Sequence, residues 1–427
     1  MNQKYSSRQR FMNDLKRKEP KPMDYEENLL FTPEGVRDIY GTECERRRKV
    51  EEDIHKIMKQ YGFHYIQTPT YEFFDIFKQE RGTVASKEMF KFFDQYNNTL
   101  VLRPDITPSI ARCVAKYYSG EELPIRLSYS GSTFIHRRGY QGKLSEISQI
   151  GAELMNDSSS DADAEMIALT VECLAKSGLQ EFKIDVGHAA FIRGIMEEAG
   201  FTSEEAEQYK RLLANKNIFG VEEMIEAKPI SAKWKEFLIR LPDLFGEKET
   251  LQYAREHVNN ALAREALERL EKVYEILDIY GLSESVTFDL SMLSHYEYYT
   301  GIIFKAYTYG TGEAIATGGR YDKLLEQFGK KAPAVGLAIV LDQLMNALDR
   351  QKAEIPVSDN GVLILYQSSD RKKAVDMANR YRTEGRAVSL MRKNAHTEMC
   401  VYEKYAKRHG ISTVIKVERD QENILDV

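Results

Sequence analysis

Cysteine is scarce in this chain, and its few copies are widely separated. The 427 residues include 4 cysteines, at Cys44, Cys113, Cys173 and Cys400, and no CxxC pair. This scatter excludes a paired-cysteine zinc motif and gives no basis for a disulfide framework. The histidines are also dispersed, and the sequence contains neither HExxH nor GxSxG. We therefore assign no metal site, no cofactor and no catalytic residue.

Long apolar stretches are missing as well. No run approaches the roughly 18 residues that a membrane span needs, and the longest relevant one is Val362 to Tyr366. The N-terminal residues are basic but lack the apolar core of a secretory signal. These absences predict a cytoplasmic protein without a membrane partner. The net charge of −6 gives no broad attraction to nucleic acid, which argues against a tRNA partner.

The pattern that is present divides the chain into several parts, as its length predicts. Residues 1–28 are polar and interrupted by prolines, which predicts a flexible N-terminal arm. Residues 29–350 mix strand and helix patterns and predict one domain, with a helical insert at about 190–280. After a polar linker, residues 361–427 alternate as β-α-β-α-β, which predicts a small separate α/β module.

Individual elements follow from periodicity. Apolar residues at helical spacing predict helices over 43–60 and 161–176. The segment YGTGEAIATGG predicts a glycine-bearing turn before a helix that starts near Arg320. Its glycines fit neither a P-loop nor a dinucleotide fingerprint, so we interpret them as hairpin and turn residues.

Polar side chains recur within strand-like segments. They are Arg103, Asp105 and Thr107 in LRPDITP, Gln149 and Glu153 in SQIGAEL, and Tyr298, Tyr299 and Tyr321. Strand alternation places Gln149, Gly151 and Glu153 on one face, and the glycine leaves space for a small pocket. Taken alone, such residues are more often a satisfied buried network or a solvated sheet face. Together they offer carboxylates and an amide oxygen to an ammonium group, and an acceptor and a hydroxyl to an imidazole.

These segments resemble the core of histidyl-tRNA synthetase, a class II aminoacyl-tRNA synthetase, over nearly the whole chain. FTPEGVRDIYG, LRPDITPSIAR, EYYTGIIFKAY and ATGGRYDKLLEQFG match landmarks of that family in order. The resemblance implies an α+β fold with a class II antiparallel sheet flanked by helices, and dimerisation through YGFHYIQTPTYE. It also implies histidine recognition, by Asp105, Thr107, Gln149, Glu153, Tyr298, Tyr299 and Tyr321.

The sequence departs from the synthetases where they contact ATP. Ile135 and Gln343 stand where that family has arginines, and Arg137 stands where it has a glutamate for adenine. Positioned cations at a developing phosphoryl charge commonly contribute about two to three orders of magnitude each in rate, so we expect no adenylation. Ser294 replaces the arginine that acts at the amino-acid carboxylate, and Arg320 is a possible substitute anchor.

Retained amino-acid ligands beside lost ATP ligands resemble the synthetase paralogue that regulates ATP phosphoribosyltransferase. LRPDITPSIARCVA, with Asp105 in place of the synthetase glutamate, and IDVGHAAFIRGIMEEAG both resemble that family more. The resemblance implies a non-catalytic regulatory subunit in the first step of histidine biosynthesis. Such a subunit dimerises within a hetero-oligomer, pairs with a short-form catalytic subunit and mediates feedback inhibition by histidine.

Two alternatives remain at this point. A working histidyl-tRNA synthetase would catalyse histidine-dependent ATP–pyrophosphate exchange. A histidine-binding pseudo-synthetase with another partner would bind histidine without activating a short phosphoribosyltransferase. The C-terminal module resembles a truncated anticodon-binding domain, and we interpret it as a remnant or a contact for the partner.

Overall fold

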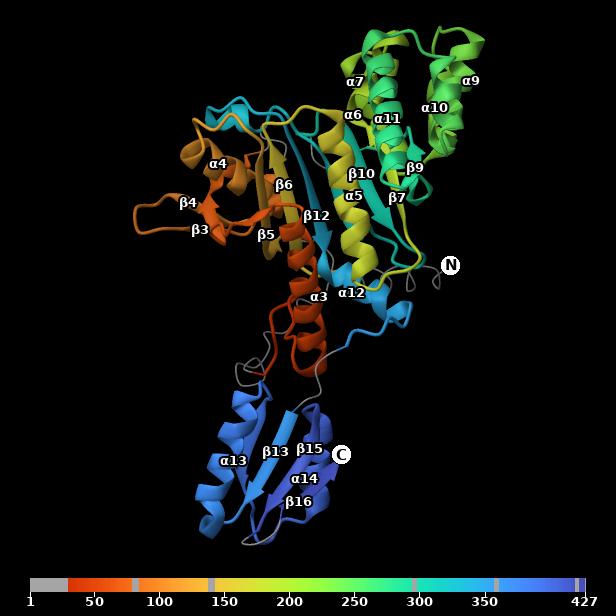
Figure 1. The fold of residues 1–427 in the computed structure, drawn as a ribbon. Helices are drawn as coiled ribbons and strands as arrows, with labels where there is room; N and C mark the ends of the chain where they lie inside the picture. The colour runs from red at the N-terminus through yellow and green to blue at the C-terminus, as the bar shows by residue number, and fades with distance from the viewer. Residues whose placement is uncertain are drawn as a thin grey trace, which may run out of the picture. The chain divides into compact units, whose positions relative to one another are not determined.

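The structure, a computed structural model, describes residues 30–78, 84–136, 143–293, 298–356, 361–418 and 422–426 (Figure 1). The chain forms two compact units: Met1–Asp38 with Arg137–Ser145, and Ile39–His136 with Glu146–Val427. In the first unit the Ser145 amide donates to the Gly35 carbonyl over 2.7 Å. The predicted arm at residues 1–28 lies outside the described residues.

A nine-stranded sheet lies at the centre of the second unit, in the order β1-β5-β6-β12-β11-β10-β7-β9-β8. Neighbouring strands run antiparallel except at β1–β5 and β7–β9, which are parallel. The predicted antiparallel sheet flanked by helices is therefore confirmed. The strands are β1 (His64–Tyr65), β5 (Ile125–Phe134), β6 (Glu146–Met155), β7 (Lys183–His188), β8 (Phe245–Gly246), β9 (Val286–Asp289), β10 (Ile302–Tyr307), β11 (Ala316–Arg320) and β12 (Ala334–Val340).

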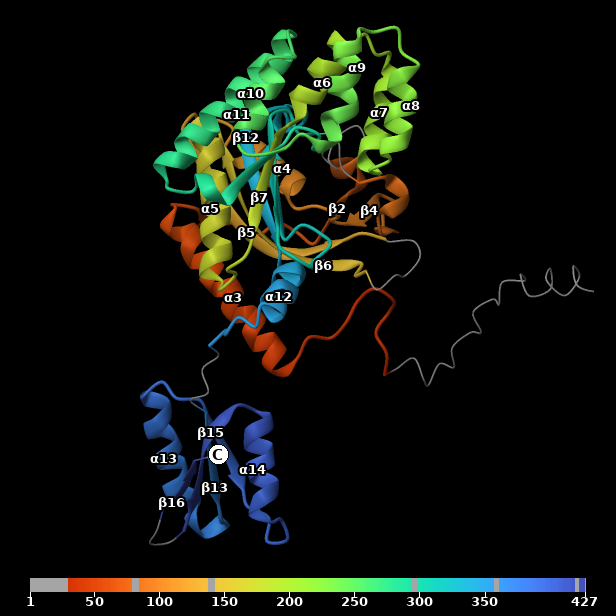
Figure 2. The same ribbon diagram turned by 90° about the vertical axis from the view of Figure 1, so that its right-hand side faces the viewer.

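One face of this sheet, here called the helix face, is covered by long helices (Figures 1 and 2). They are α3 (Gly41–Gln60), α5 (Ser160–Lys176) and α12 (Leu341–Arg350). The apolar residues of α3 and α5 pack with alternate residues of β6, β10 and β12 into the main hydrophobic core. Gly62 follows α3 with a φ of +82°. This left-handed conformation terminates the helix. The predicted helices over 43–60 and 161–176 are confirmed.

The opposite face, here called the pocket face, carries a smaller apolar cluster built on α4 (Thr107–Tyr117) and the 3₁₀ helix η6 (Leu325–Phe328). Beside it lies a three-stranded sheet with the strand order β2 (Tyr71–Phe73), β4 (Thr99–Leu102), β3 (Lys91–Phe93). Figure 2 shows α4 on the side of the sheet away from α5. The remaining short 3₁₀ helices are η1 (Phe74–Phe77), η3 (Ser86–Glu88), η4 (Leu241–Asp243), η5 (Ser283–Ser285) and η7 (Ser368–Asp370).

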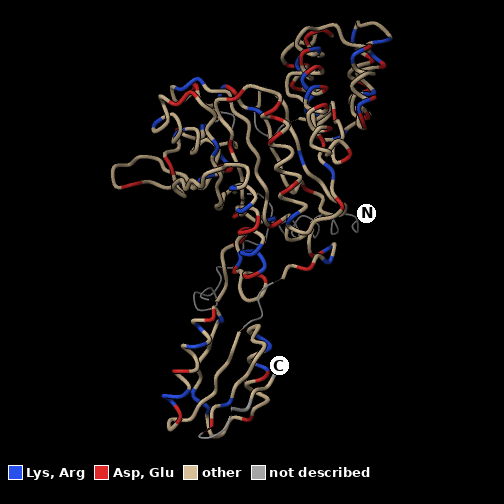
Figure 3. The backbone as a smooth tube through the Cα atoms, in the orientation of Figure 1, with Lys and Arg blue, Asp and Glu red and all other residues tan. Residues whose placement is uncertain are grey.

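Helices fill the region predicted as an insert. Thr202 and Glu205 form a capping box at the start of α7, and the Asn260 side chain caps α11 by accepting from the Ala263 amide. Lys, Arg, Asp and Glu are interspersed along these helices (Figure 3), as on a solvated surface. The helices are α6 (Ala189–Glu198), α7 (Ser203–Ala214), α8 (Ile218–Glu226), α9 (Ala232–Arg240), α10 (Glu249–Arg255) and α11 (Ala261–Ile279).

The C-terminal module has a four-stranded sheet in the order β14-β13-β15-β16. Its strands are β13 (Gly361–Tyr366), β14 (Val388–Arg392), β15 (Ile411–Val417) and β16 (Glu422–Asp426). Separate apolar clusters join one face of this sheet to α13 (Arg371–Thr383) and the other face to α14 (Met399–Arg408). The predicted β-α-β-α-β order is present. The prediction omitted β16, which pairs antiparallel with β15.

The predicted helix start near Arg320 is wrong, because β11 continues through Arg320 and only the 3₁₀ helix η6 follows. Gly318 and Gly319 are strand residues rather than turn residues. A Cβ at Gly318 would overlap the Phe304 ring, so this glycine allows two strands and an aromatic side chain to pack closely. Gly310 and Gly312 do lie in the turn, with φ values of 85° and 68°.

Within the described ranges, no helix is long and apolar enough to cross a membrane. The same residues contain no cluster of three or more His, Cys, Asp or Glu side chains that could hold a metal ion.

Candidate functional site

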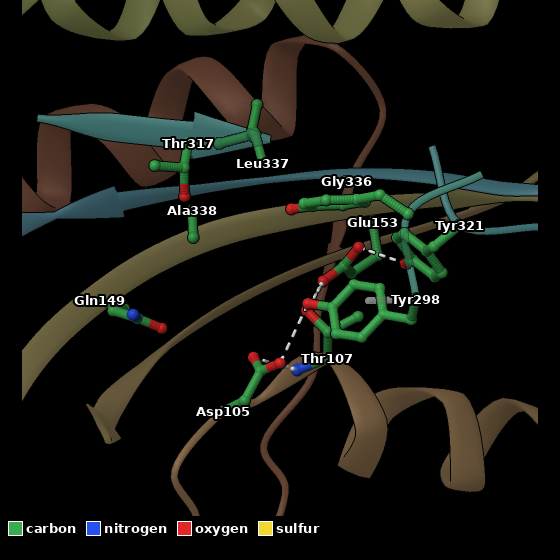
Figure 4. A pocket seen from close by; sticks show the side chains of 11 residues that line it. Asp105, Thr107, Gln149, Glu153, Tyr298, Thr317, Tyr321, Gly336, Leu337 and Ala338 are labelled. Carbon is green, nitrogen blue, oxygen red and sulfur yellow. Dashed lines mark hydrogen bonds between the residues drawn. The ribbon is translucent and has the colours of Figure 1, made fainter. Parts of the chain in front are cut away.

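A small polar pocket lies on the pocket face of the nine-stranded sheet, near the start of α4 (Figure 4). It brings together seven of the eight residues predicted to bind histidine. Side chains and backbone from β6, β11, β12, α4 and the segment before β10 form its walls. The lining residues are Asp105, Thr107, Gln149, Glu153, Tyr298, Tyr299, Thr317, Tyr321, Gly336, Leu337 and Ala338.

Strand register places Glu153 at the floor of the pocket. Glu153 pairs with Gly336 across β6 and β12, and a Cβ at Gly336 would overlap the Glu153 carboxyl group. The glycine therefore makes room for a buried acid between two central strands. Ile150, Ala152 and Leu154, the alternate residues of β6, belong to the main core on the helix face. Alternation along β6 thus separates the polar floor from the apolar core.

The space expected at Gly151 is not part of the pocket. Gly151 pairs with Tyr129 of β5, and a Cβ at Gly151 would overlap the Tyr129 ring and hydroxyl. The glycine therefore accommodates a buried tyrosine instead of leaving room between Gln149 and Glu153, and the expectation was wrong on this point. Tyr129 was not singled out from the sequence, because only the pairing of β5 with β6 reveals its position.

Hydroxyl groups hold both acids of the pocket. Thr107 Oγ1 donates to Glu153 Oε1 over 2.6 Å, and the Tyr321 hydroxyl donates to the other oxygen of Glu153. The Tyr298 hydroxyl donates to Asp105 Oδ2 over 3.0 Å, and the Thr107 amide donates to Asp105 Oδ1 over 3.2 Å. Figure 4 shows these bonds converging from α4, β6 and the segment around Tyr298.

The electrostatics of the pocket favour a ligand that donates hydrogen bonds or carries a positive charge. Burial, reinforced by the neighbouring Asp105 carboxyl, raises the pKa of Glu153 to about 8. Burial also raises the pKa of Asp105. Gln149 Oε1 is buried and accepts no hydrogen bond from the described residues, which is costly for an amide oxygen. None of the described lining residues is a Lys, Arg or His.

The pocket is contracted in this conformation. Its cavity measures about 20 Å³, which is room for about one water molecule. A ligand of amino-acid size is larger than this cavity. The Tyr298 ring stands edge-on to the Tyr299 and Tyr321 rings, with centroids 5.0 and 5.8 Å away.

Arg320 does not reach the pocket, so its suggested role as carboxylate anchor lacks the necessary geometry. It alternates with Thr317 and Gly319 along β11, and its side chain points to the helix face. There its Nε donates to Asp163 Oδ1 over 2.8 Å, and its Nη1 donates to Asp322 over 3.1 Å. Although burial opposes its charge, these two carboxylates raise the pKa of Arg320. The side chain completes a buried ion-pair network.

Arg103, also singled out from the sequence, has a structural role. Its guanidinium donates to the backbone carbonyls of Ser132 and Thr68 over 2.8 and 2.9 Å. It thereby joins β5 to the segment before β2. A Cβ at Gly131 would overlap the guanidinium group, so the glycine gives the arginine its place.

Positions predicted to have lost ATP contacts are partly described. Ile135 is partly buried and carries no charge. The Gln343 side chain donates to Glu313 Oε2 over 3.1 Å, so its hydrogen-bond partner is an acid. Arg137 and Ser294 lie outside the described residues.

Four lining residues were missed from the sequence: Thr317 of β11 and Gly336, Leu337 and Ala338 of β12. Their small or apolar side chains carry no chemical signal. The alternation of Thr317 and Gly319 could have indicated one wall of the pocket, had β11 been recognised as a strand.

Comparison with known proteins gives one consistent family. A sequence profile described as histidyl-tRNA synthetase matches residues 35–344. The ATP phosphoribosyltransferase regulatory subunit of Acetivibrio thermocellus is 38% identical over 395 residues, covering 92% of this chain and 94% of the relative. The protein of the same name from Geobacter sulfurreducens is 35% identical over 392 residues, covering 91% and 89%.

Solved structures agree with these matches. A protein from Bacillus halodurans, described as an ATP phosphoribosyltransferase regulatory subunit/histidyl-tRNA synthetase, superposes with a TM-score of 0.82 at 31% identity, covering 91% of this chain and 98% of its own. Histidyl-tRNA synthetase from Nostoc superposes with a TM-score of 0.78 at 18% identity, covering 93% and 94%. At that identity the second likeness concerns the fold alone.

Proposed function

The chain belongs to the family of ATP phosphoribosyltransferase regulatory subunits, which has the histidyl-tRNA synthetase fold, and on this premise we propose that it is a non-catalytic regulatory subunit. The partner is a short-form catalytic subunit that condenses ATP with phosphoribosyl pyrophosphate. This chain contributes assembly and feedback control, and histidine is the effector.

The observation that carries the proposal is the contrast between the two ends of the site. The amino-acid end retains buried acceptors, whereas Gln343 at the nucleotide end is neutral and bonded to Glu313. A glutamate in that place repels phosphate oxygens instead of binding them. The site therefore suits amino-acid binding without amino-acid activation.

Histidine matches the pocket group by group. Asp105 and Gln149 Oε1 lie toward one side in Figure 4 and can accept from the ligand's ammonium. Glu153 lies with the Tyr321 hydroxyl on the other side, where a carboxylate and a hydroxyl can bind the imidazole nitrogens. The contracted cavity makes binding a conformational event: the tyrosine rings separate when the ligand enters. Such coupling is what an effector site requires.

The segment containing β1 and β2 supports self-association. Tyr65, Tyr71 and Phe73 are 58%, 55% and 54% exposed, and exposed aromatic residues are enriched at protein interfaces. We propose that dimers of this chain, formed through this segment, are the core of a hetero-oligomer with the catalytic subunit.

Reconstitution tests the proposal. The purified chain is mixed with the short catalytic subunit, and phosphoribosyl-ATP formation is assayed with and without L-histidine. We expect co-elution, stimulation by this chain, and inhibition by histidine only in the complex. Absence of both co-elution and stimulation would contradict the regulatory role. Histidine-dependent ATP–pyrophosphate exchange by the chain alone would instead establish a working synthetase.

A further inference from the structure

The carboxylate of an amino-acid ligand needs a cation that the pocket lining does not provide. Each titratable side chain that lines it, within the described residues, is an acid or a tyrosine. Arg320 points to the helix face, and Ser294 cannot supply a positive charge. A zwitterion bound among acids alone would place its carboxylate in an unfavourable field.

Lys305 of β10 is next to the pocket on the correct face of the sheet. It pairs directly with Thr317 of β11, and Thr317 lines the pocket. Directly paired residues have side chains on the same face, with Cβ atoms about 5 Å apart. The alternate residues of β10, Ile302 and Phe304, belong to the main core on the helix face, which confirms the orientation of Lys305.

The backbone that follows β9 holds the Lys305 ammonium. Its Nζ donates to the Leu293 carbonyl over 3.1 Å, in the segment that leads toward Tyr298. In sequence, Leu293 immediately precedes the position where the synthetases have their carboxylate-binding arginine. An ammonium group has three N–H donors, so it can keep this bond and also bind a carboxylate oxygen.

The neighbours of Lys305 orient it and favour its charged form. Burial lowers the pKa of Lys305, and the Asp289 and Asp185 carboxylates counteract this. Asp185 pairs with Lys305 across β7 and β10, and its Oδ1 accepts from Thr287 over 2.6 Å. A polar row therefore runs across the sheet from Thr287 to Thr317 and continues the pocket floor by three strands, β10, β7 and β9.

We infer that Lys305 is the specificity residue that binds the ligand's carboxylate, in place of the arginine that the synthetases use. This inference rests on the proposed function, because it concerns the same effector site. With Asp105 at the ammonium group, Glu153 at the imidazole and Lys305 at the carboxylate, the site complements a zwitterion. It therefore distinguishes an amino acid from the corresponding amine.

Calorimetric titration of the full chain with L-histidine and with histamine, which lacks the carboxylate, tests this inference. The variants are Lys305→Met, the conservative Lys305→Arg, and Lys372→Met as a matched loss of charge on the exposed surface of the C-terminal module. Lys305→Met should weaken histidine binding about tenfold or more, the scale of a lost charge-assisted hydrogen bond. Its affinity for histamine should change less than about twofold. Lys305→Arg should retain most of the discrimination, and Lys372→Met all of it.

Histamine binding also reports on folding, because a variant that still binds histamine has an intact pocket. Equal weakening of both ligands by Lys305→Met, or unchanged histidine affinity, would overturn the role of Lys305 while leaving histidine sensing in place. If Lys305→Met does not fold, Lys305→Arg decides: wild-type discrimination supports the inference, and equal weakening of both ligands contradicts it. A wild-type chain that binds neither ligand would overturn the effector site itself.

Discussion

Two buried acids on opposite faces of the same sheet have very different surroundings. Asp163 on the helix face is fully buried and lies between Arg320 and Arg269, with N–O distances of 2.7 and 2.6 Å. Glu153 on the pocket face is 1% exposed, and it accepts hydrogen bonds from the hydroxyls of Thr107 and Tyr321. The first acid has two arginines as counter-charges, whereas the second, within the part of the chain that the structure describes, has neutral donors.

This difference separates structure from function. A buried carboxylate between two arginines has its charge balanced within the fold, and its removal leaves the arginine charges without partners. A buried carboxyl group among hydroxyls takes up a proton instead, and the raised pKa of Glu153 is the consequence. Burial raises the pKa of Asp163 too, but the Arg320 and Arg269 guanidiniums oppose that rise. Glu153 has hydroxyl partners instead, and it is therefore poised to exchange its proton for a cationic ligand. The following variants test this contrast, from the largest expected effect to the smallest.

Asp163→Ala should cause the largest loss of stability. It leaves Arg320, which is 4% exposed, buried with a weakened set of partners. Removing one member of a buried ion pair typically costs about 3–5 kcal/mol. Urea unfolding should show a loss of this size in the free energy of unfolding, whether or not histidine is present. A loss below about 1 kcal/mol, which is typical of a surface ion pair, would contradict a stabilising role for this buried network.

Glu153→Ala should have its main effect on the ligand. Histidine inhibition of the reconstituted complex should shift to about 10- to 100-fold higher concentration, because a hydrogen bond to a charged group contributes about 1.5–3 kcal/mol. Co-elution with the catalytic subunit should be unchanged. Gel filtration and the inhibition curve measure the two effects separately. An unchanged inhibition curve would remove Glu153 from the site.

The proton on Glu153 predicts a pH dependence of the ligand-free chain. Its pKa is raised from 4.5 to about 8, so the folded state binds the proton more tightly than the unfolded state. The stabilisation is complete below pH 4.5, is lost as pH rises, and is gone above the folded pKa. Glu153→Gln should remove this loss, so its stability relative to wild type should increase by about 2–3 kcal/mol between pH 5 and pH 7. If the free energy of unfolding of both proteins changed in parallel with pH, Glu153 would not be protonated in the folded chain.

Gln343→Arg should have the smallest effect. The new arginine can pair with Glu313, the present partner of Gln343. An exposed or partly exposed pair changes stability by about 1 kcal/mol or less. ATP–pyrophosphate exchange should stay at background, because Ile135 still lacks the charge that holds a phosphate. A measurable gain of ATP–pyrophosphate exchange would show that the arginine at position 343 was the one missing ATP contact that prevented the reaction.

Local patterns predicted most elements but not their pairing. The periodicity of Val50, Ile54 and Ile57 was sufficient for α3, because a helix face is fixed by its own sequence. The glycines of β11 made this strand look like a turn in the sequence. They are needed because the Phe304 and Tyr299 rings pack against them, which only the tertiary structure shows. Arg320 was therefore suggested as a carboxylate anchor, although its place in β11 turns its side chain to the helix face.

The candidate site was predicted largely through family resemblance, and its physical state was not. The seven lining residues gathered as expected. The contracted cavity, the proton on Glu153 and the position of Tyr129 depend on burial and strand register, which are non-local. Lys305 went unnoticed because a lysine in a strand has no signal until its cross-strand neighbours are known.

The central claim is that Glu153 carries a proton that it gives up when histidine binds. Calorimetric titration of the chain with L-histidine at pH 7, in two buffers of different ionisation enthalpy, measures this directly. The account predicts binding with net proton release in the wild type and a smaller release in Glu153→Gln. Binding with no difference between buffers, or an equal release in both proteins, would contradict it.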